Sequence, residues 1–313
     1  RDHVRLLPAL GKTEAGDEGY HDGLEAITAM EQLERLRDRP FFLAVGFHKP
    51  HLPFNAPKRY WDLYPKEGIP LADNRFEPEG LTPWSLPDFG ELRGYFGMPD
   101  EGPVPEGLAR TLIQGYCACV SYMDAQLGKV LDKLDELGLA EDTVVMLWGD
   151  HGWKLGEHAS WCKHTNFEID ARAPLLVRAP GMQQAGRPCE RLVEFVDMYP
   201  TLCALCGLEI PAHCEGTSFA PLLDDPEQQW KTAAFSQYPR RGVMGTTIRT
   251  DRFRYTEWCD TETGEIRGRE LYDHETDPQE NVNAAEHAAY KAEAERLHKI
   301  LEQGWQGAVP DGR

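Results

Sequence analysis

Short apolar runs that alternate with long amphipathic stretches constrain this chain more than any other feature of its sequence. Residues 41–47 read Phe-Phe-Leu-Ala-Val-Gly-Phe, and residues 143–148 read Thr-Val-Val-Met-Leu-Trp. A third run lies at residues 173–178. Runs of this length between turn signals are typical of strands buried on both faces. Separated by helices, they predict an α/β domain with a mostly parallel sheet sandwiched by helices.

Two stretches carry the apolar periodicity of amphipathic helices. Apolar residues recur at threes and fours over residues 25–37 and again over residues 106–137, where Gly138 supplies a helix stop. Residues 52–105 are rich in Pro and Gly instead. We expect that segment to be a long surface excursion, of the kind that often carries substrate contacts.

The pattern changes after about residue 230. Strand-like segments follow one another without long helices between them, at residues 233–238, 243–250, 253–258 and 270–273. Asp251-Arg252 predicts a tight hairpin, and a closing helix from about Ala284 to Gln303 would bury Leu297, Ile300 and Leu301. We therefore expect a main part at residues 1–230 and a smaller C-terminal α+β subdomain at residues 231–313, an antiparallel sheet covered by a helix.

Charge and hydropathy exclude two classes of partner. The 313 residues include 33 Lys and Arg against 52 Asp and Glu, a net charge of −19, and no segment gathers five or more basic residues. This balance argues against nucleic acid as a partner. The longest apolar run, residues 41–47, is far shorter than the 18 or more residues that cross a bilayer, so we expect no membrane span.

Polar clusters follow directly after the first two apolar runs. The first contains Lys49 and His51, and the second begins with Asp150-His151. Because the carboxyl ends of parallel strands share one edge of a sheet, we expect the two clusters to face one another. Asp150 and His151 offer a carboxylate and an imidazole to a divalent cation, which needs at least two more ligands. The alternative is a plain turn in which the aspartate caps backbone amides and Gly152 takes a positive φ.

Cationic side chains beside this crevice favour an anionic ligand. Lys49, His51, Lys163 and His164 gather near the two clusters although the chain is strongly acidic overall. For any one of these lysines, a solvated surface position remains the alternative.

Taken together, these blocks resemble the sulfatases, within the alkaline-phosphatase-like superfamily, and most closely the iduronate-2-sulfatase-like enzymes. The resemblance spans nearly the whole chain and is most specific in the His-Lys-Pro-His and Asp-His-Gly-Trp blocks. The matching segments are residues 40–54, 149–158, 161–167, 196–202, 236–240, 248–250 and 253–256.

The resemblance implies an incomplete alkaline-phosphatase-like fold, with residues 1–230 as the downstream portion of the catalytic domain. It implies a sulfuric ester hydrolase that uses calcium and a formylglycine nucleophile made from a cysteine. On the positions that match the family motif, Asp150 and His151 would be calcium ligands. Lys163 would bind a sulfate oxygen and the bridging oxygen, and His51 would bind sulfate and protonate the leaving alcohol.

The resemblance also implies contacts to the substrate from Lys49, Trp153 and His164. That substrate would be a sulfated carbohydrate, with a 2-O-sulfated uronic acid in a glycosaminoglycan-like or algal polysaccharide favoured. A periplasmic, secreted or lysosomal-type location is expected on the same grounds.

One departure from the family pattern matters more than any match. None of the 8 cysteines is followed by x-Pro-Ser-Arg. The resemblance places the formylglycine and two further calcium ligands upstream of Arg1, so this N-terminal segment is expected as a partner of the chain. We therefore expect the chain alone to be inactive and to fold poorly, because central strands would be lost.

Two other functions stay open. A phosphodiesterase or phosphonate monoester hydrolase of the same superfamily shares the Asp-His-Gly block and a downstream Gly-x-His. A non-catalytic carbohydrate-binding relative would keep the crevice after losing its nucleophile.

Overall fold

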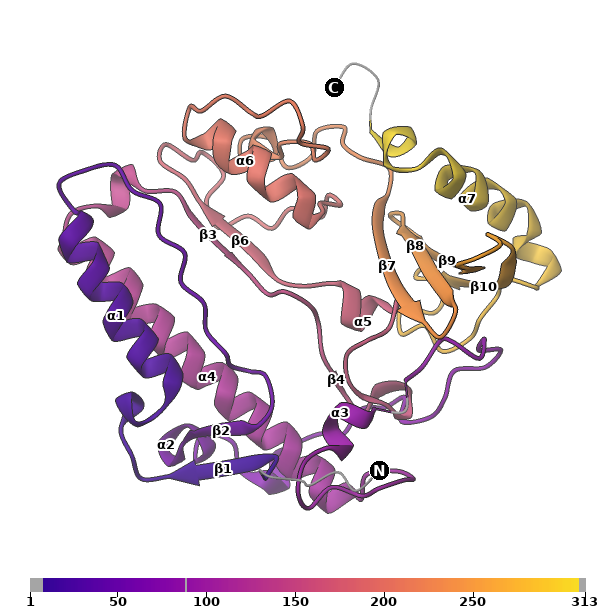
Figure 1. Ribbon diagram of the computed structural model, residues 1–313, viewed down its shortest axis with the longest axis horizontal. Coiled ribbons are helices and arrows are strands. Elements are labelled where there is room, and N and C mark those ends of the chain that lie inside the picture. Colours follow the sequence, from indigo (N-terminus) through magenta and orange to yellow (C-terminus); the bar gives the residue numbers. More distant parts are fainter. Residues whose placement is uncertain (1–7, 88, 310–313) are drawn as a thin grey trace. The chain divides into compact units, whose positions relative to one another are not determined.

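The structure of the protein is a computed structural model that describes residues 8–87 and 89–309, and in it the chain divides into two units. Unit 1 comprises residues 8–75, 89–143 and 155–162, and unit 2 comprises residues 76–87, 144–154 and 163–309 (Figure 1). The division predicted at residue 230 falls within unit 2 and stays a prediction.

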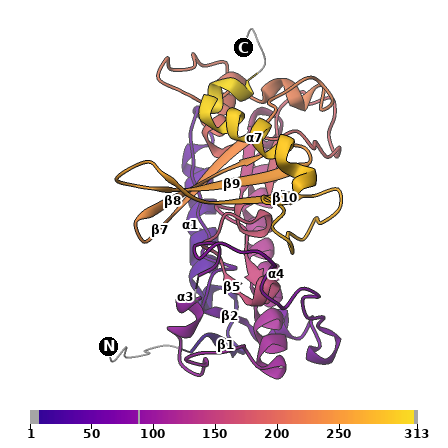
Figure 2. The ribbon, with the colours of Figure 1, turned by 90° about the vertical axis from the view of Figure 1, so that its right-hand side faces the viewer.

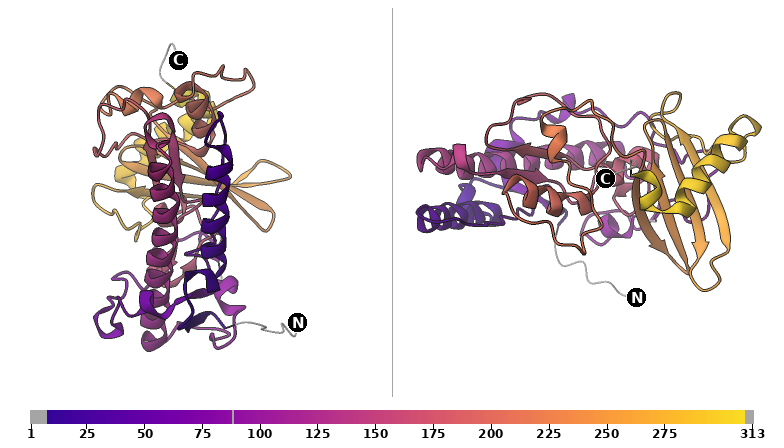
Figure 3. Two further views of the ribbon diagram at one scale, coloured as in Figure 1. Left: turned by 90° about the vertical axis from the view of Figure 1, so that its left-hand side faces the viewer. Right: turned by 90° about the horizontal axis from the view of Figure 1, so that it is seen from above.

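Unit 1 is built on its two longest helices, α1 (His21–Leu36) and α4 (Glu106–Glu136). They lie side by side (Figure 3), and each carries buried residues, Leu33 in α1 and Leu112 in α4 among them. Gly138 follows α4 with a φ of 68°, which suits glycine at a helix end. Both predicted helices are confirmed, although α1 begins four residues before Glu25.

A short parallel pair completes unit 1. β1 (Leu10–Thr13) pairs with β2 (Phe54–Pro57), and both contact α4. The excursion predicted for residues 52–105 contains β2, a 3-10 turn and two single-turn helices, α2 (Lys58–Trp61) and α3 (Gly90–Arg93). Neither strand was expected from the sequence.

The strand predicted at residues 41–47 is not formed. This segment has no regular secondary structure, and Phe42 is 83% exposed. A strand needs a neighbour that takes up its backbone hydrogen bonds, and among the described residues none pairs with this segment. The apolar composition alone therefore misled the prediction of a buried strand.

The next two predicted strands exist in unit 2, with a different pairing. β3 (Val145–Trp148) and β6 (Leu175–Arg178) run antiparallel, and one face of the pair packs on α6 (Met198–Leu205). On the other face of the pair, Leu176 is 58% exposed. The only α-helix in the described connection between the strands is the single turn α5 (Glu168–Ala171), whereas a parallel return commonly uses a long crossover helix. Among the described strands, β1 and β2 form the parallel pair, and two isolated parallel bridges join Pro8 to Phe96 and Glu79 to Val282.

The C-terminal part of unit 2 is an antiparallel four-stranded sheet, as predicted. β7 (Ala234–Arg240), β8 (Val243–Arg249), β9 (Phe253–Asp260) and β10 (Ile266–Asp273) are neighbours in sequence order. The hairpin at Asp251-Arg252 joins β8 to β9. The closing helix α7 (Lys291–Gln303) lies on one face of the sheet (Figure 2), with Leu297 fully buried and Ile300 and Leu301 partly buried against it.

Two two-residue strands, β4 (Lys154–Leu155) and β5 (Trp161–Cys162), complete the described elements. In the part of the chain that the structure describes, no helix is both long and apolar enough to cross a membrane.

Candidate functional site

Asp150 and His151 come directly after β3, where the chain leaves the sheet. The imidazole Nδ1 of His151 donates a hydrogen bond to the carbonyl oxygen of Gly152 at 2.8 Å, so in the neutral ring Nε2 carries the lone pair. That Nε2 lies 3.6 Å from Oδ2 of Asp150, whose side chain is 85% exposed. Two atoms that share one cation at about 2.4 Å are separated by about 3.4 Å, so this pair has the spacing of two ligands of one ion.

Gly152 fixes the loop that carries this pair. Its amide donates to the carbonyl of Asp170 in α5 at 2.8 Å. A Cβ atom at this position would stand 1.9 Å from the carbonyl oxygen of Ile169, so no other residue fits without moving the backbone. The glycine of the Asp-His-Gly block is therefore required by close packing, and it does not take the positive φ that the turn alternative assumes.

A buried ion pair joins this loop to the segment that carries Lys163. Lys154 is fully buried, and its Nζ lies 3.0 Å from Oδ1 of Asp170 and donates to the hydroxyl of Thr165 at 3.1 Å. Thr165 in turn donates to Asp170. A buried lysine needs such compensation, because an unpaired charge in this environment is costly. The three side chains therefore hold residues 149–154 and 163–167 together.

The ring of Trp153 contacts two other predicted side chains of unit 2. His151 stacks on its ring at a centroid separation of 5.9 Å and an interplanar angle of 26°. The Nζ of Lys163 lies 4.7 Å from the centroid of the Trp153 ring, in cation–π contact. The structure thus brings Asp150, His151, Trp153 and Lys163 into one cluster.

His164 is held by strand β7. Its Nδ1 is hydrogen-bonded to the hydroxyl of Tyr238 at 2.8 Å, and its carbonyl oxygen accepts from Arg240. Arg240 also lies 4.5 Å over the Tyr238 ring. Both lie in residues 236–240, a segment that carries the family resemblance, but the sequence analysis gave neither of them a role.

In unit 1, the predicted residues Lys49 and His51 lie on one anchored turn. The backbone amide of Lys49 donates to Oδ2 of the buried Asp22 at 3.0 Å, and its Nζ donates to the carbonyl of Pro53 at 2.8 Å. Burial lowers the pKa of Lys49, and the nearby Asp22 carboxylate opposes that shift.

Both ring nitrogens of His51 face oxygen acceptors. Nδ1 lies 2.8 Å from the carbonyl oxygen of Leu52, and Nε2 lies 3.0 Å from Oε1 of Glu91 in α3. Contacts at both nitrogens fix the orientation of the ring.

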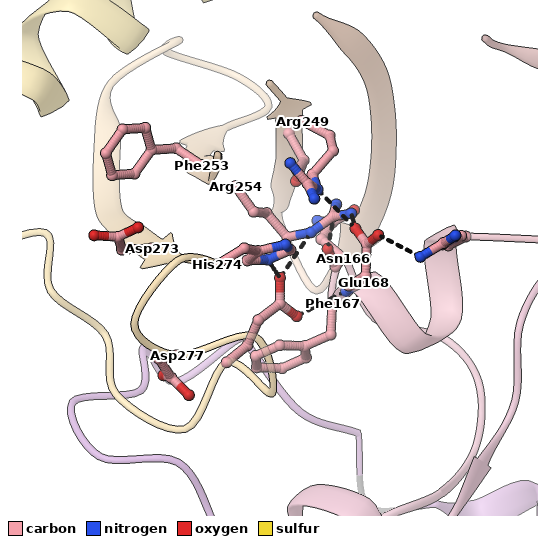
Figure 4. A network of polar contacts seen from close by, with 12 residues as sticks. Asn166, Phe167, Glu168, Arg249, Phe253, Arg254, Asp273, His274 and Asp277 are labelled. Carbon is pink, nitrogen blue, oxygen red and sulfur yellow. Dashed lines mark hydrogen bonds and ion pairs between the residues drawn. The ribbon is translucent and has the colours of Figure 1, made fainter. Parts of the chain in front are cut away.

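A second layer of charge anchors the segment after Lys163 to the C-terminal sheet (Figure 4). The carboxylate of Glu168 forms ion pairs with Arg249 of β8, at 3.0 Å between Nε and Oε2, and with Arg254 of β9. Arg254 also donates a hydrogen bond to the carbonyl oxygen of Asn166 at 3.0 Å. Burial raises the pKa of Glu168, but Arg254 and Arg249 outweigh it, so the pKa lies below its usual range. The carboxylate therefore stays ionised and holds its arginines.

Comparison with known proteins agrees with this chemistry. The family model for sulfatases matches residues 10–208. The chain belongs to the sulfatase family. A second family model, for the C-terminal region of N-sulphoglucosamine sulphohydrolase, matches residues 156–306.

Individual sulfatase relatives and solved structures extend the comparison. The chain is 34% identical to iduronate 2-sulfatase of Mus musculus, over 90% of the chain and 64% of that protein. BT4656, solved with its substrate D-glucosamine-2-N,6-O-disulfate, superposes with a TM-score of 0.78 at 22% identity, over 92% of this chain and 70% of that one. Phosphonate monoester hydrolase of Silicibacter pomeroyi gives the same TM-score and identity, over 95% and 62%. The alkaline-phosphatase-like fold is thereby confirmed, and the chain spans about two thirds of the lengths of these proteins.

Proposed function

We propose that this protein is the larger part of a sulfuric ester hydrolase that acts on a sulfated carbohydrate in the manner of the iduronate-2-sulfatase-like enzymes. The cluster of Asp150, His151, Trp153 and Lys163 carries the proposal, because it joins two cation ligands to a cationic side chain suited to an oxyanion. Membership of the sulfatase family supports the reaction class. It also supports a periplasmic, secreted or lysosomal-type location.

The donor atoms of the cluster fit a hard divalent cation such as calcium. Asp150 would hold it through a carboxylate oxygen and His151 through Nε2, the nitrogen left with the lone pair. Bound there, calcium would supply positive charge next to a sulfate oxygen. The hydrogen bond from His151 to Gly152 keeps the ring oriented for that role.

Five further roles belong to side chains of this chain. Lys163 binds a sulfate oxygen and the bridging oxygen, where negative charge develops as the ester breaks. His51, paired with Glu91, gives its proton to the leaving alcohol. Lys49, Trp153 and His164 contact the carbohydrate.

The proposed reaction needs a nucleophile that these 313 residues do not offer in the family's form. They contain no Cys-x-Pro-Ser-Arg segment, and the proposed calcium site needs two ligands besides Asp150 and His151. We propose that an additional N-terminal segment brings the formylglycine and two calcium ligands, and that the 313-residue chain by itself releases no sulfate from 4-nitrocatechol sulfate. An in-frame Cys-x-Pro-Ser-Arg codon run upstream of Arg1 is the expected genomic finding, and turnover by the purified chain would contradict the proposal.

Substitution of Lys163 tests the site within the longer protein. Lys163→Ala should reduce kcat for sulfate esters by at least about 100-fold, because a charge-stabilising group of the transition state is lost. Lys299→Ala on the exposed face of α7 is the matched control and should leave kcat unchanged. A near-normal rate for a folded Lys163→Ala protein would remove Lys163 from the site.

A phosphonate monoester hydrolase is the second candidate, favoured by the structural likeness to the Silicibacter pomeroyi enzyme. Relative kcat/KM for a sulfate monoester and a phenyl phosphonate monoester, measured on the longer protein, separates the two. A higher value for the phosphonate would replace the sulfatase proposal. Binding of a sulfated oligosaccharide without turnover of either ester would assign a carbohydrate-binding role instead.

A further inference from the structure

Two histidines and a glutamate that have no part in the proposed reaction meet on the surface of unit 1. His21 and Glu25 lie one turn apart at the start of α1, and His48 follows in the turn that precedes Lys49. The Nδ1 atoms of His21 and His48 lie 3.1 Å and 3.7 Å from Oε1 of Glu25. The ligand atoms of all three residues lie within 4.8 Å of one another.

The glutamate of this cluster is incompletely satisfied by its two histidines. Its second oxygen, Oε2, is buried and has no hydrogen-bond partner. A buried carboxylate oxygen without a partner loses its hydration and gains nothing in return. Glu25 thus presents one oxygen to two imidazoles and keeps a free acceptor beside them, which is the arrangement that a cation would complete.

The cluster is held in place by a residue outside it. Asp22 is fully buried and accepts the backbone amides of His48 at 3.1 Å and of Lys49 at 3.0 Å. This carboxylate fastens the His48 turn to the first turn of α1, so His48 stays near His21, with ring centroids 4.8 Å apart. Little conformational freedom remains to be lost when an ion binds.

We propose that His21, Glu25 and His48 form a binding site for a divalent transition metal ion, with Zn²⁺ as its representative. Two imidazole nitrogens and one carboxylate oxygen are a ligand set that zinc accepts with a fourth position open, whereas calcium and magnesium prefer oxygen ligands. Zinc ligands at about 2.1 Å from the metal lie about 3.4 Å apart, so modest side-chain rotation closes the cluster.

The exposed imidazoles make the ion accessible and leave its open position to water or an external ligand. The side chains of His21 and His48 are 68% and 65% exposed. A bound ion would tie the turn that carries Lys49 and His51 to α1. The proposal is independent of the proposed sulfatase function, because none of its three ligands has a part in that chemistry.

Titration of the untagged 313-residue chain with ZnCl₂ tests the site. Calorimetry should give one tight site in the native chain, and His21→Ala, Glu25→Gln or His48→Ala should each weaken it at least about tenfold. His213→Ala, which removes an exposed histidine from unit 2, is the matched control and should bind as the native chain does. Equal affinity in all these proteins would overturn the proposal.

The 8 cysteines require a second measurement, because thiolates also bind zinc. Co²⁺ in place of Zn²⁺ should give visible d–d absorption without the intense ultraviolet band of thiolate ligation. A crystal soaked in Zn²⁺ should show anomalous density between the two imidazoles and Glu25. A thiolate band, or density only at cysteines, would overturn the proposal even if the native chain bound zinc tightly.

Discussion

In the part of the chain that the structure describes, two groups of three histidine and carboxylate side chains have ligand atoms close together, and they differ in how their negative charge is balanced. In unit 1, His21, Glu25 and His48 stand at the surface with no lysine or arginine paired to Glu25 in the described residues. In unit 2, Glu168, His274 and Glu280 have ligand atoms equally close together. There, however, cations of the protein itself already occupy the space between the carboxylates.

Arg249 and Arg254 supply the positive charge in the cluster of unit 2. Arg254 is 3% exposed and forms an ion pair with Glu168. Its Nε also lies 2.9 Å from Oε1 of Glu280, and Nε2 of His274 lies 2.8 Å from the same oxygen. The buried cluster is therefore a closed structural network, whereas the surface cluster keeps an unfilled acceptor. Ligand atoms that lie close together do not by themselves make a metal site. Where arginine side chains already balance the carboxylates, as at Glu168 and Glu280, a metal ion is not needed.

The largest effect that this contrast predicts comes from Arg254→Met. Removal of the guanidinium leaves Glu168 and Glu280 buried without their main cation, so the free energy of unfolding should fall by about 3–5 kcal/mol. Urea denaturation measures it. Arg296→Met breaks the half-exposed pair with Glu293 and should cost under about 1 kcal/mol. Similar small losses in both variants would show that the buried network contributes no more than a surface pair.

Acid should weaken the same network by a smaller amount. Burial raises the pKa of Glu280, but Arg254 and His274 more than offset it, and the pKa of Glu168 is lowered as well. Both folded-state pKa values therefore lie below 4.5, the ordinary value. Their contribution to stability is complete above pH 4.5 and is lost as pH falls through the folded-state values. Urea midpoints measured between pH 7 and pH 3 should fall more steeply for the native chain than for Arg254→Met, and parallel curves would contradict the assignment.

The smallest effect is expected at the surface cluster. Without metal, His21→Ala and His48→Ala should change the free energy of unfolding by no more than about 0.5 kcal/mol, because both imidazoles are solvated. With Zn²⁺ present, the native chain should gain melting temperature and these variants should not. A large loss in the metal-free state would mean that the surface cluster, like the buried one, serves mainly to hold the fold.

Helices and strands that depend on the pattern of residues close together in the sequence were predicted correctly. The spacing of apolar residues located α1 and α4, and alternation with turn signals located β7 to β10. Elements that depend on distant partners were missed or misread. β1 forms because it pairs with β2, some forty residues later in the chain. Residues 41–47 were predicted as a strand from their composition, which does not show whether a partner strand is present.

The candidate site divides in the same manner. The sequence put forward Asp150, His151, Trp153 and Lys163 as candidates because strand ends, metal-ligand types and family motifs lie close together in it, and the structure brings these side chains into one cluster. Tyr238 and Arg240, which hold the segment around His164, lie more than 70 residues away from it, and the partner of Glu168 in β9 is 86 residues away. No short pattern carries such pairings, so the supports of the site came only from the structure.

The absence of a side chain at Gly152 has a mechanical consequence. A Cβ atom at this position would collide with the carbonyl oxygen of Ile169, and Lys154 in the same loop forms an ion pair with the next residue, Asp170. Asp150, His151 and Lys163, the candidate cation ligands and the candidate sulfate-binding lysine, are thus carried by segments that are fixed to one another. A substitution that adds a side chain at Gly152 would displace these candidate residues together.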